Sequence, residues 1–94
     1  MIESFKDKRT RDFAEGVRVR AFDGFAAQAH KRLRLLHLAR HLQALSALPS
    51  NRLEALKGNR KGQYSIRINS QWRICFEWPD SGTGPTNVEI VDYH

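Results

Sequence analysis

Alternation of hydrophobic and polar residues dominates the last third of the chain and constrains its fold more than any other feature. It runs through three segments, at residues 63–69, 71–78 and 87–94. A repeat of two residues predicts β-strands that bury one face and expose the other. The apolar face requires a covering layer, whereas the polar face carries Arg67 and Arg73. We therefore expect helices on one side of a sheet and a phosphate-bearing ligand on the other.

The residues before these segments predict two helices. A short helix through residue 14 would follow an N-cap at Asp7 and end near Gly16. A long helix is expected from residue 23 or 24 to about residue 45, because apolar residues recur there at helical spacing. Pro49 would prevent any further extension of that helix.

The remaining segments complete an α+β pattern. Residues 1–5 predict a short strand, and residues 17–24 fit either a strand or an ordered loop. A basic loop is expected at residues 49–62, attached to the core by Leu53 and Leu56. The order is β-α-α-β-β-β, which predicts two N-terminal helices packed on one face of a mainly antiparallel sheet.

Composition limits the possible partners. The chain is 94 residues long, which predicts a single domain at residues 1–94, and 16 Lys and Arg against 10 Asp and Glu give a net charge of +6. That charge favours nucleic acid, a ribosome, an acidic protein or an anionic membrane surface. No apolar segment is long enough to cross a membrane, and the first residues do not resemble a signal peptide.

Cysteine and histidine usage indicates the compartment and argues against a metal site. The single cysteine, Cys75, excludes an internal disulfide and fits a reducing cytoplasm. The four histidines show no ligand spacing with it, and the pair His37 and His41, four residues apart, has no third ligand nearby. We therefore expect a cytoplasmic protein with no metal and no cofactor.

Three motifs resemble the HigB toxins of the RelE/ParE superfamily, and the resemblance extends over nearly the whole chain. They are Leu56-Lys-Gly-Asn-Arg-Lys-Gly-Gln-Tyr-Ser-Ile66, then Trp72-Arg-Ile74, and finally Asp92-Tyr-His94. Each motif alone is weak, but the three in this order and at these spacings are specific. The resemblance implies the toxin of a type II toxin–antitoxin pair with this α+β fold. It also implies a ribosome-dependent endoribonuclease that cuts mRNA and is silenced by a helix-turn-helix antitoxin of the HigA type, through which it meets operator DNA.

Metal-free RNA cleavage needs a base for the 2′-OH, charge stabilisation at the phosphate, an acid for the 5′-oxygen and alignment of these groups. We expect Arg73 to clamp the phosphate, because a guanidinium can bind two phosphate oxygens at once. His94 is the candidate acid or base, since histidine titrates near neutrality. Tyr93 would stack on a base or position the 2′-OH, and Asp92 would orient its neighbours.

The basic loop adds further candidates. Lys57 matches a functional lysine of the family, and Glu54 stands where some relatives carry a functional histidine. Glu54 would therefore act as a base, or else it marks a weaker site. The expected RNA-binding residues are Arg60, Lys61 and Arg67. Contacts to ribosomal RNA are expected from the basic residues of the first third, which are Lys6, Lys8, Arg9, Arg11, Arg18, Arg20, Lys31, Arg32 and Arg34.

The end of the chain leaves one question open. Strict alternation places Tyr93 on the face opposite to Asp92 and His94. Either the chain leaves the strand after Val91, or Asp92 and His94 do not face Arg73.

Two other functions fit the same residues. The superfamily includes gyrase inhibitors without nuclease chemistry, which would not need Tyr93 and His94. A catalytically weak module that acts with its antitoxin on operator DNA is the other alternative. DNA damage, rather than message cleavage, would indicate the gyrase type.

Overall fold

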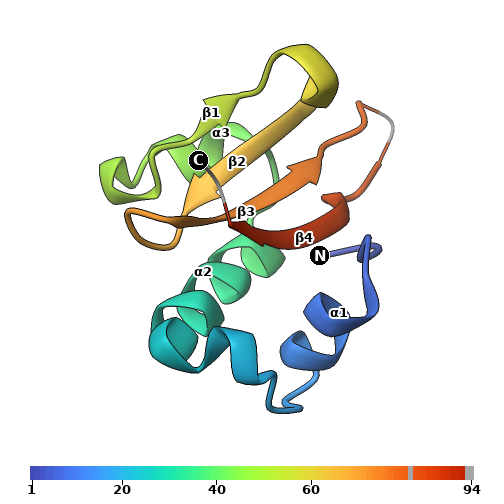
Figure 1. Cartoon of the computed structure of the whole chain (residues 1–94). Helices are drawn as coiled ribbons and strands as arrows, with labels where there is room; N and C mark the ends of the chain where they lie inside the picture. The colour runs from blue at the N-terminus through green and yellow to red at the C-terminus, as the bar shows by residue number, and fades with distance from the viewer. Residues whose placement is uncertain (81, 93–94) are drawn as a thin grey trace.

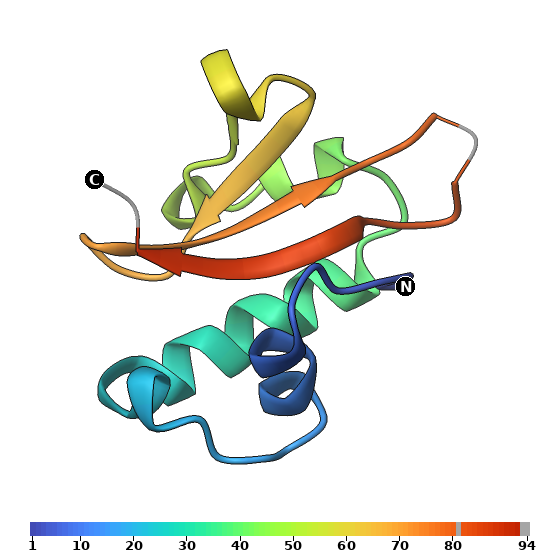
Figure 2. The same cartoon turned by 45° about the vertical axis from the view of Figure 1, so that its right-hand side comes forward.

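The computed structural model describes residues 1–80 and 82–92 and confirms the expected α+β architecture (Figure 1). One antiparallel sheet has the strand order β1-β2-β3-β4, formed by Glu54–Ala55, Gln63–Arg67, Trp72–Glu77 and Thr86–Asp92. Helices α1 (Lys8–Ala14) and α2 (Ala26–Leu38) lie together on one face of this sheet (Figure 2). Shorter elements are η1 (Arg20–Phe25), α3 (Gln43–Ser46), η2 (Pro49–Asn51) and η3 (Gly58–Arg60).

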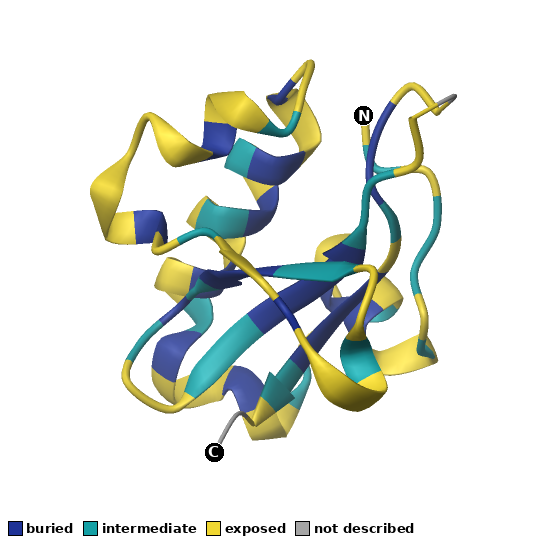
Figure 3. Ribbon diagram, turned by 90° about the horizontal axis from the view of Figure 1, so that it is seen from above, coloured by how far each residue is buried: buried dark blue, intermediate teal, exposed yellow. Residues whose placement is uncertain are grey.

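Hydrophobic side chains fill the space between the helices and the sheet. The sheet contributes residues that alternate along the three long strands, which are Ile66, Ile74, Phe76, Val88 and Ile90. The facing side of α2 contributes Ala29, Leu33 and Leu36, which lie three or four residues apart and therefore share one helical face. Figure 3 shows this division, with the central parts of the strands buried and the connecting loops mostly exposed.

An aromatic cluster determines the conformation of the segment that fitted either a strand or a loop. Residues 17–19 have no regular structure, and η1 follows as a 3₁₀ helix. Residues three apart align on a 3₁₀ helix, so both Phe22 and Phe25 enter the core. Phe22 meets Trp72 edge-on at 5.7 Å between ring centroids, and Phe25 lies 4.9 Å from the same ring.

The expectation of one long helix to residue 45 is wrong. Helix α2 begins at Ala26 and ends at Leu38, because Ala39 is extended (φ −66°, ψ 131°) and turns its buried side chain toward the core. Helix α3 follows as a separate short helix and buries Leu45. The apolar residues expected to lie on one long helix are therefore divided between α2, α3 and the connecting segment. Within residues 1–80 and 82–92, no helix is long and apolar enough to cross a membrane.

The N-terminal segment forms only one isolated bridge, between Phe5 and Val88, instead of the expected strand. It nevertheless runs parallel to β4, with Lys6 N–H donating to Val88 O (3.0 Å) and Val88 N–H donating to Ser4 O (3.1 Å). Ile90 N–H donates to the hydroxyl of Thr10 on α1 (3.1 Å). These contacts cover the edge of β4, which would otherwise expose unpaired backbone groups.

Two local predictions are confirmed, and one strand was missed. Asp7 caps α1 by accepting a 2.8 Å hydrogen bond from Thr10 N–H. Leu56 is buried and Leu53 packs against the core, as expected for the basic loop. The same loop contains the two-residue strand β1, which sequence reasoning assigned to irregular structure.

Candidate functional site

The sheet face that turns away from the helices carries polar residues from all four strands. Glu54 pairs with Ser65, Ser65 with Cys75, and Cys75 with Glu89, so these four residues form one row across the sheet. Directly opposite residues in antiparallel strands project to the same face. We call this the outer face, because the two main helices cover the other one.

Arg73 lies in the next row of the outer face, beside Arg67 on β2. Its Nε donates to Ser65 Oγ at 2.7 Å, and its Nη2 donates to the carbonyl of Arg52 at 2.7 Å. Arg52 adopts the left-handed conformation (φ 46°) directly after η2. Two hydrogen bonds from different nitrogens fix the plane of a guanidinium, so Arg73 is held on the outer face opposite to Ile74, as its position in the alternation predicted.

A second cationic cluster surrounds Glu89. Arg60 Nη1 donates to Glu89 Oε1 at 2.8 Å and to Gln63 Oε1 at 3.0 Å. Lys6 Nζ lies 3.6 Å from the same Glu89 oxygen. Arg60, an expected RNA-binding residue, is therefore engaged with the sheet in this structure.

Cys75 lies between these two clusters and is completely buried. Burial raises the pKa of its thiol, and the positive charge of Arg60 offsets part of that rise. The thiol is therefore protonated near neutral pH and is not a nucleophile. Within residues 1–80 and 82–92, no group of three His, Cys, Asp or Glu side chains is placed to hold a metal ion.

The register of β4 decides part of the question about the chain end. The strand continues through Asp92, which pairs with Trp72 and so shares the helix-side face rather than that of Arg73. Asp92 is exposed at the end of the strand and accepts a 2.9 Å hydrogen bond from Gln71 Nε2. Tyr93 and His94 lie outside the described residues.

The other predicted site residues lie on β1, on either side of η3 and at the end of β2. Glu54 is exposed on β1, and Lys57 and Lys61 are exposed on either side of η3. Arg67 is half-buried, and its backbone carbonyl accepts a 3.0 Å hydrogen bond from Arg32 Nε of α2.

Several basic residues of the first third have partners within the chain. Lys8 forms a 2.6 Å ion pair with Asp12, four residues on. Arg18 pairs with Asp23 at 2.6 Å, and the hydrogen bonds of this exposed pair raise the pKa of Arg18 and lower that of Asp23. The guanidinium carbon of Arg9 lies 5.0 Å from the centre of the Phe22 ring.

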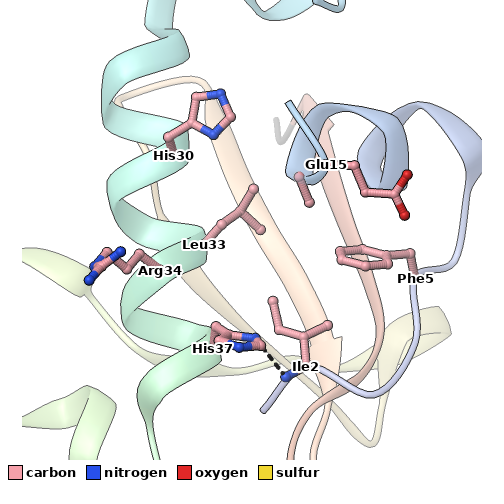
Figure 4. A pocket seen from close by; sticks show the side chains of 8 residues that line it. Ile2, Phe5, Glu15, His30, Leu33, Arg34 and His37 are labelled. Atoms are coloured by element: carbon pink, nitrogen blue, oxygen red, sulfur yellow. Dashed lines mark hydrogen bonds between the residues drawn. The ribbon is translucent and has the colours of Figure 1, made fainter. Parts of the chain in front are cut away.

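A separate cavity of about 500 Å³ lies on the helix side of the molecule (Figure 4). It is lined by Ile2, Phe5, Ala14, Glu15, His30, Leu33, Arg34 and His37. His37 Nδ1 accepts a 3.3 Å hydrogen bond from the backbone N–H of Ile2, shown as a dashed line. Because α2 ends at Leu38, His41 does not share a helix with His37, and the two are not a helical pair of metal ligands.

Sequence reasoning missed the residues that hold the arginines in place. The alternation already assigned Ser65 and Glu89 to the polar face, and this assignment was the sequence signal by which they could have been found. Their partners depend on the register between strands and on loop contacts, since Arg60 reaches Glu89 across 29 positions and Arg73 reaches Arg52 across 21. A backbone carbonyl such as that of Arg52 has no sequence signature at all.

Comparison with known proteins identifies the family. The family model described as "RelE-like toxin of type II toxin-antitoxin system HigB" matches residues 3–94. Toxin HigB-1 of Vibrio cholerae serotype O1 is 39% identical over 82 residues, which cover 85% of this chain and 86% of the relative. Endoribonuclease HigB of Proteus vulgaris is 33% identical over 99 aligned residues, covering 100% of both chains.

Solved structures agree with this assignment at the level of the fold. A chain of the YoeB-YefM complex from Staphylococcus aureus matches with a TM-score of 0.61 and 19% identity, covering 100% of this chain and 98% of the other. A second chain, from a heterotetrameric YoeB-YefM toxin-antitoxin complex of the same organism, gives 0.56 with the same identity and coverage. With the family model spanning the strands of the outer face and both N-terminal helices, the chain belongs to the RelE-like HigB toxins of type II toxin–antitoxin systems.

Proposed function

We propose that the protein is an endoribonuclease that cleaves mRNA on the ribosome without a metal ion. Membership of the HigB toxins supports this function, and a relative that is 33% identical over the full chain is named an endoribonuclease. The observation that carries the proposal is the fixed guanidinium of Arg73, held at two points on a cationic sheet face. A preorganised cation of this kind stabilises the negative charge that develops on a phosphate in the transition state.

The reaction is an attack by the ribose 2′-oxygen on the adjacent phosphorus. The bond from phosphorus to the 2′-oxygen forms, the bond to the 5′-oxygen breaks, and the products carry a 2′,3′-cyclic phosphate and a 5′-hydroxyl. Arg73 binds the non-bridging oxygens while their charge grows. Glu54, which shares the outer face and pairs with Ser65 beside Arg73, accepts the 2′-proton.

The chain end supplies the remaining groups. His94 donates a proton to the 5′-oxygen, which requires the chain to depart from the strand alternation after Asp92, because Asp92 itself shares the helix-side face. Tyr93 stacks on a base next to the cut. Asp92, bonded to Gln71, holds the end of β4 from which both residues follow. Lys57 neutralises phosphate charge together with Arg73.

The remaining basic residues bind the message and the ribosome. Arg60, Lys61 and Arg67 contact the message at phosphates, which gives affinity without sequence preference. The exposed basic residues Arg11, Arg20, Lys31 and Arg34 contact ribosomal RNA. The toxin works in the cytoplasm, and a helix-turn-helix antitoxin of the HigA type binds it and links it to operator DNA.

Induction of the protein in a host cell, followed by primer-extension mapping of a translated message, tests this function. Arg73→Ala and a deletion of Tyr93 and His94 should each lower cleavage by roughly 10²–10³-fold. Arg40→Ala, an exposed arginine between α2 and α3, is the matched control and should cleave like the wild type. The downstream fragments should carry 5′-hydroxyl ends that a kinase labels without prior phosphatase treatment.

The outcomes separate the competing functions. Cuts that persist unchanged in both variants would contradict the assignment of Arg73 and of the chain end. Growth arrest with DNA damage and intact messages would instead identify a gyrase inhibitor.

A further inference from the structure

Glu89 is a buried carboxylate on the outer face. Its negative charge would repel the phosphates of an RNA bound there. The residue is 9% exposed, and one of its oxygens meets both Arg60 (2.8 Å) and Lys6 (3.6 Å). Burial of such a group costs desolvation energy that its partners largely offset, so an ion pair of this kind adds little net stability. Its value must lie in the arrangement that it enforces.

That arrangement concerns the basic turn, which we define as residues 57–61. The turn carries Lys57 at its start, Arg60 within it and Lys61 at its end. It contains no buried residue, and Gly58 within it and Gly62 after it both have positive φ. Its backbone therefore receives little support from packing. The Arg60 side chain, which crosses to β4 and also binds Gln63, ties the turn to the sheet.

We propose that Glu89 is a positioning residue for the message. By holding Arg60 against the sheet, it fixes the Arg60 guanidinium at Glu89, in the row next to that of Arg73, and ties down the basic turn at the Gln63 end of the sheet. Arg60 and the turn then meet the phosphates that follow or precede the scissile one. Glu89 also pairs with Lys6, which brings a cation from the N-terminal segment next to Arg60. This role rests on the proposed function, because it presupposes RNA on the outer face.

The expected kinetic effect differs from that of Arg73. Contacts to neighbouring phosphates are the same in the ground state and the transition state, so their loss raises KM and leaves kcat nearly unchanged. Loss of Arg73 should lower kcat instead, since its contact strengthens as charge develops.

Cleavage by purified toxin on ribosomes programmed with a defined message measures this split. Glu89→Gln keeps the size and the acceptor oxygen but removes the charge. It should raise KM about 10-fold with kcat changed less than about 3-fold. The plot of log kcat/KM against log salt should become about one unit shallower, because phosphate contacts are lost. Glu77→Gln on β3, whose Oε1 accepts from Asn87, is the matched control and should match the wild type in both measurements.

Arg60→Gln breaks the same Arg60–Glu89 ion pair by changing its residue in the basic turn. This variant is the alternative test if Glu89→Gln folds poorly. Since Arg60 also contacts the message, Arg60→Gln should raise KM at least as much as Glu89→Gln. The double variant should be no worse than Arg60→Gln alone, because Glu89 acts only through Arg60. An unchanged KM in Glu89→Gln or in Arg60→Gln, with the toxin folded and active, would overturn the positioning role.

Hydrogen exchange reports on the turn without any RNA. The amides of Arg60 and Lys61 bond to the carbonyls of Lys57 and Gly58. They should exchange roughly 10-fold faster in Glu89→Gln. Faster exchange in a protein that cuts no RNA would contradict the proposed function while supporting Glu89 as the anchor of the turn, whereas unchanged exchange would refute that anchor directly.

Discussion

Replacement of Ser65 by alanine removes one anchor of Arg73 and leaves the guanidinium itself in place. Ser65 is fully buried, and its Oγ accepts the 2.7 Å hydrogen bond from Arg73 Nε. A hydrogen bond to a charged group contributes about 1.5–3 kcal/mol. Arg73 is half-buried, so water replaces part of the bond, and we expect a loss of about 1–2 kcal/mol. The bond from Nη2 to the Arg52 carbonyl remains and prevents complete release of the side chain.

The expected effect on the cleavage rate follows from the same loss of hydrogen-bond energy. Each 1.4 kcal/mol of lost transition-state stabilisation lowers a rate about tenfold, so Ser65→Ala should reduce kcat roughly 5- to 30-fold. This is less than the 10²–10³-fold loss expected for Arg73→Ala. A loss of about 1 kcal/mol in folding stability would lower the melting temperature by about 4–8 °C in a domain of this size.

Single-turnover cleavage on purified ribosomes and thermal unfolding followed by circular dichroism measure the two effects. Ser46→Ala provides the control, because it also removes a 2.7 Å serine hydrogen bond, to Gln43 O in α3, without touching Arg73. A wild-type kcat in Ser65→Ala would refute the need for this anchor. A loss as complete as that of Arg73→Ala would show that Ser65 does more than hold the arginine.

Two further predictions concern folding. Asp7→Ala removes the 2.8 Å cap on Thr10 N–H and should lower the free energy of unfolding by about 1 kcal/mol in urea titrations, whereas Asp7→Ser should restore most of it. Burial raises the pKa of Cys75 in the folded state, so above about pH 8.5 the unfolded state loses this proton while the folded state keeps it. Stability should therefore be fully present below that pH and should fall as the pH rises through the folded pKa of the thiol. Cys75→Ala should flatten this alkaline slope, and an identical slope in both proteins would contradict the assignment.

The elements that sequence reasoning identified are those whose signal is local. The two-residue alternation through Ile66 and Ile74 requires only that one face be buried, and it predicted β2 and β3 close to their observed bounds. The cap at Asp7 likewise depends on residues within one turn of helix. The order of the elements was also read from the residue pattern, and the resemblance to HigB toxins, carried by motifs in these strands and in the basic loop, implied the same α+β fold.

The elements that it missed depend on contacts between distant segments. No glycine or proline stands at Ala39 to indicate that the helix ends there. The helix ends because Ala39 and Leu45 can both pack into the core only after such a break. Strand β1 exists because Glu54 and Ala55 find partners on β2, which composition does not show. The partners of Arg73 and Arg60 are set by register, and a shift of one residue would move every side chain to the opposite face.

The way in which residues 3–10 cover β4 has a consequence for how the chain acquires its structure. These contacts join positions about eighty apart, as between Thr10 and Ile90 on β4 or between Glu3 and Thr83 in the loop just before it. Such closure is entropically costly and slow compared with helix formation. Helix α1 can form early, but it has no surface to dock on until β4 has been made and has joined the sheet. A nascent chain that stalls before β4 would therefore hold its first helix undocked, and the row that ends in Glu89 would be incomplete during synthesis.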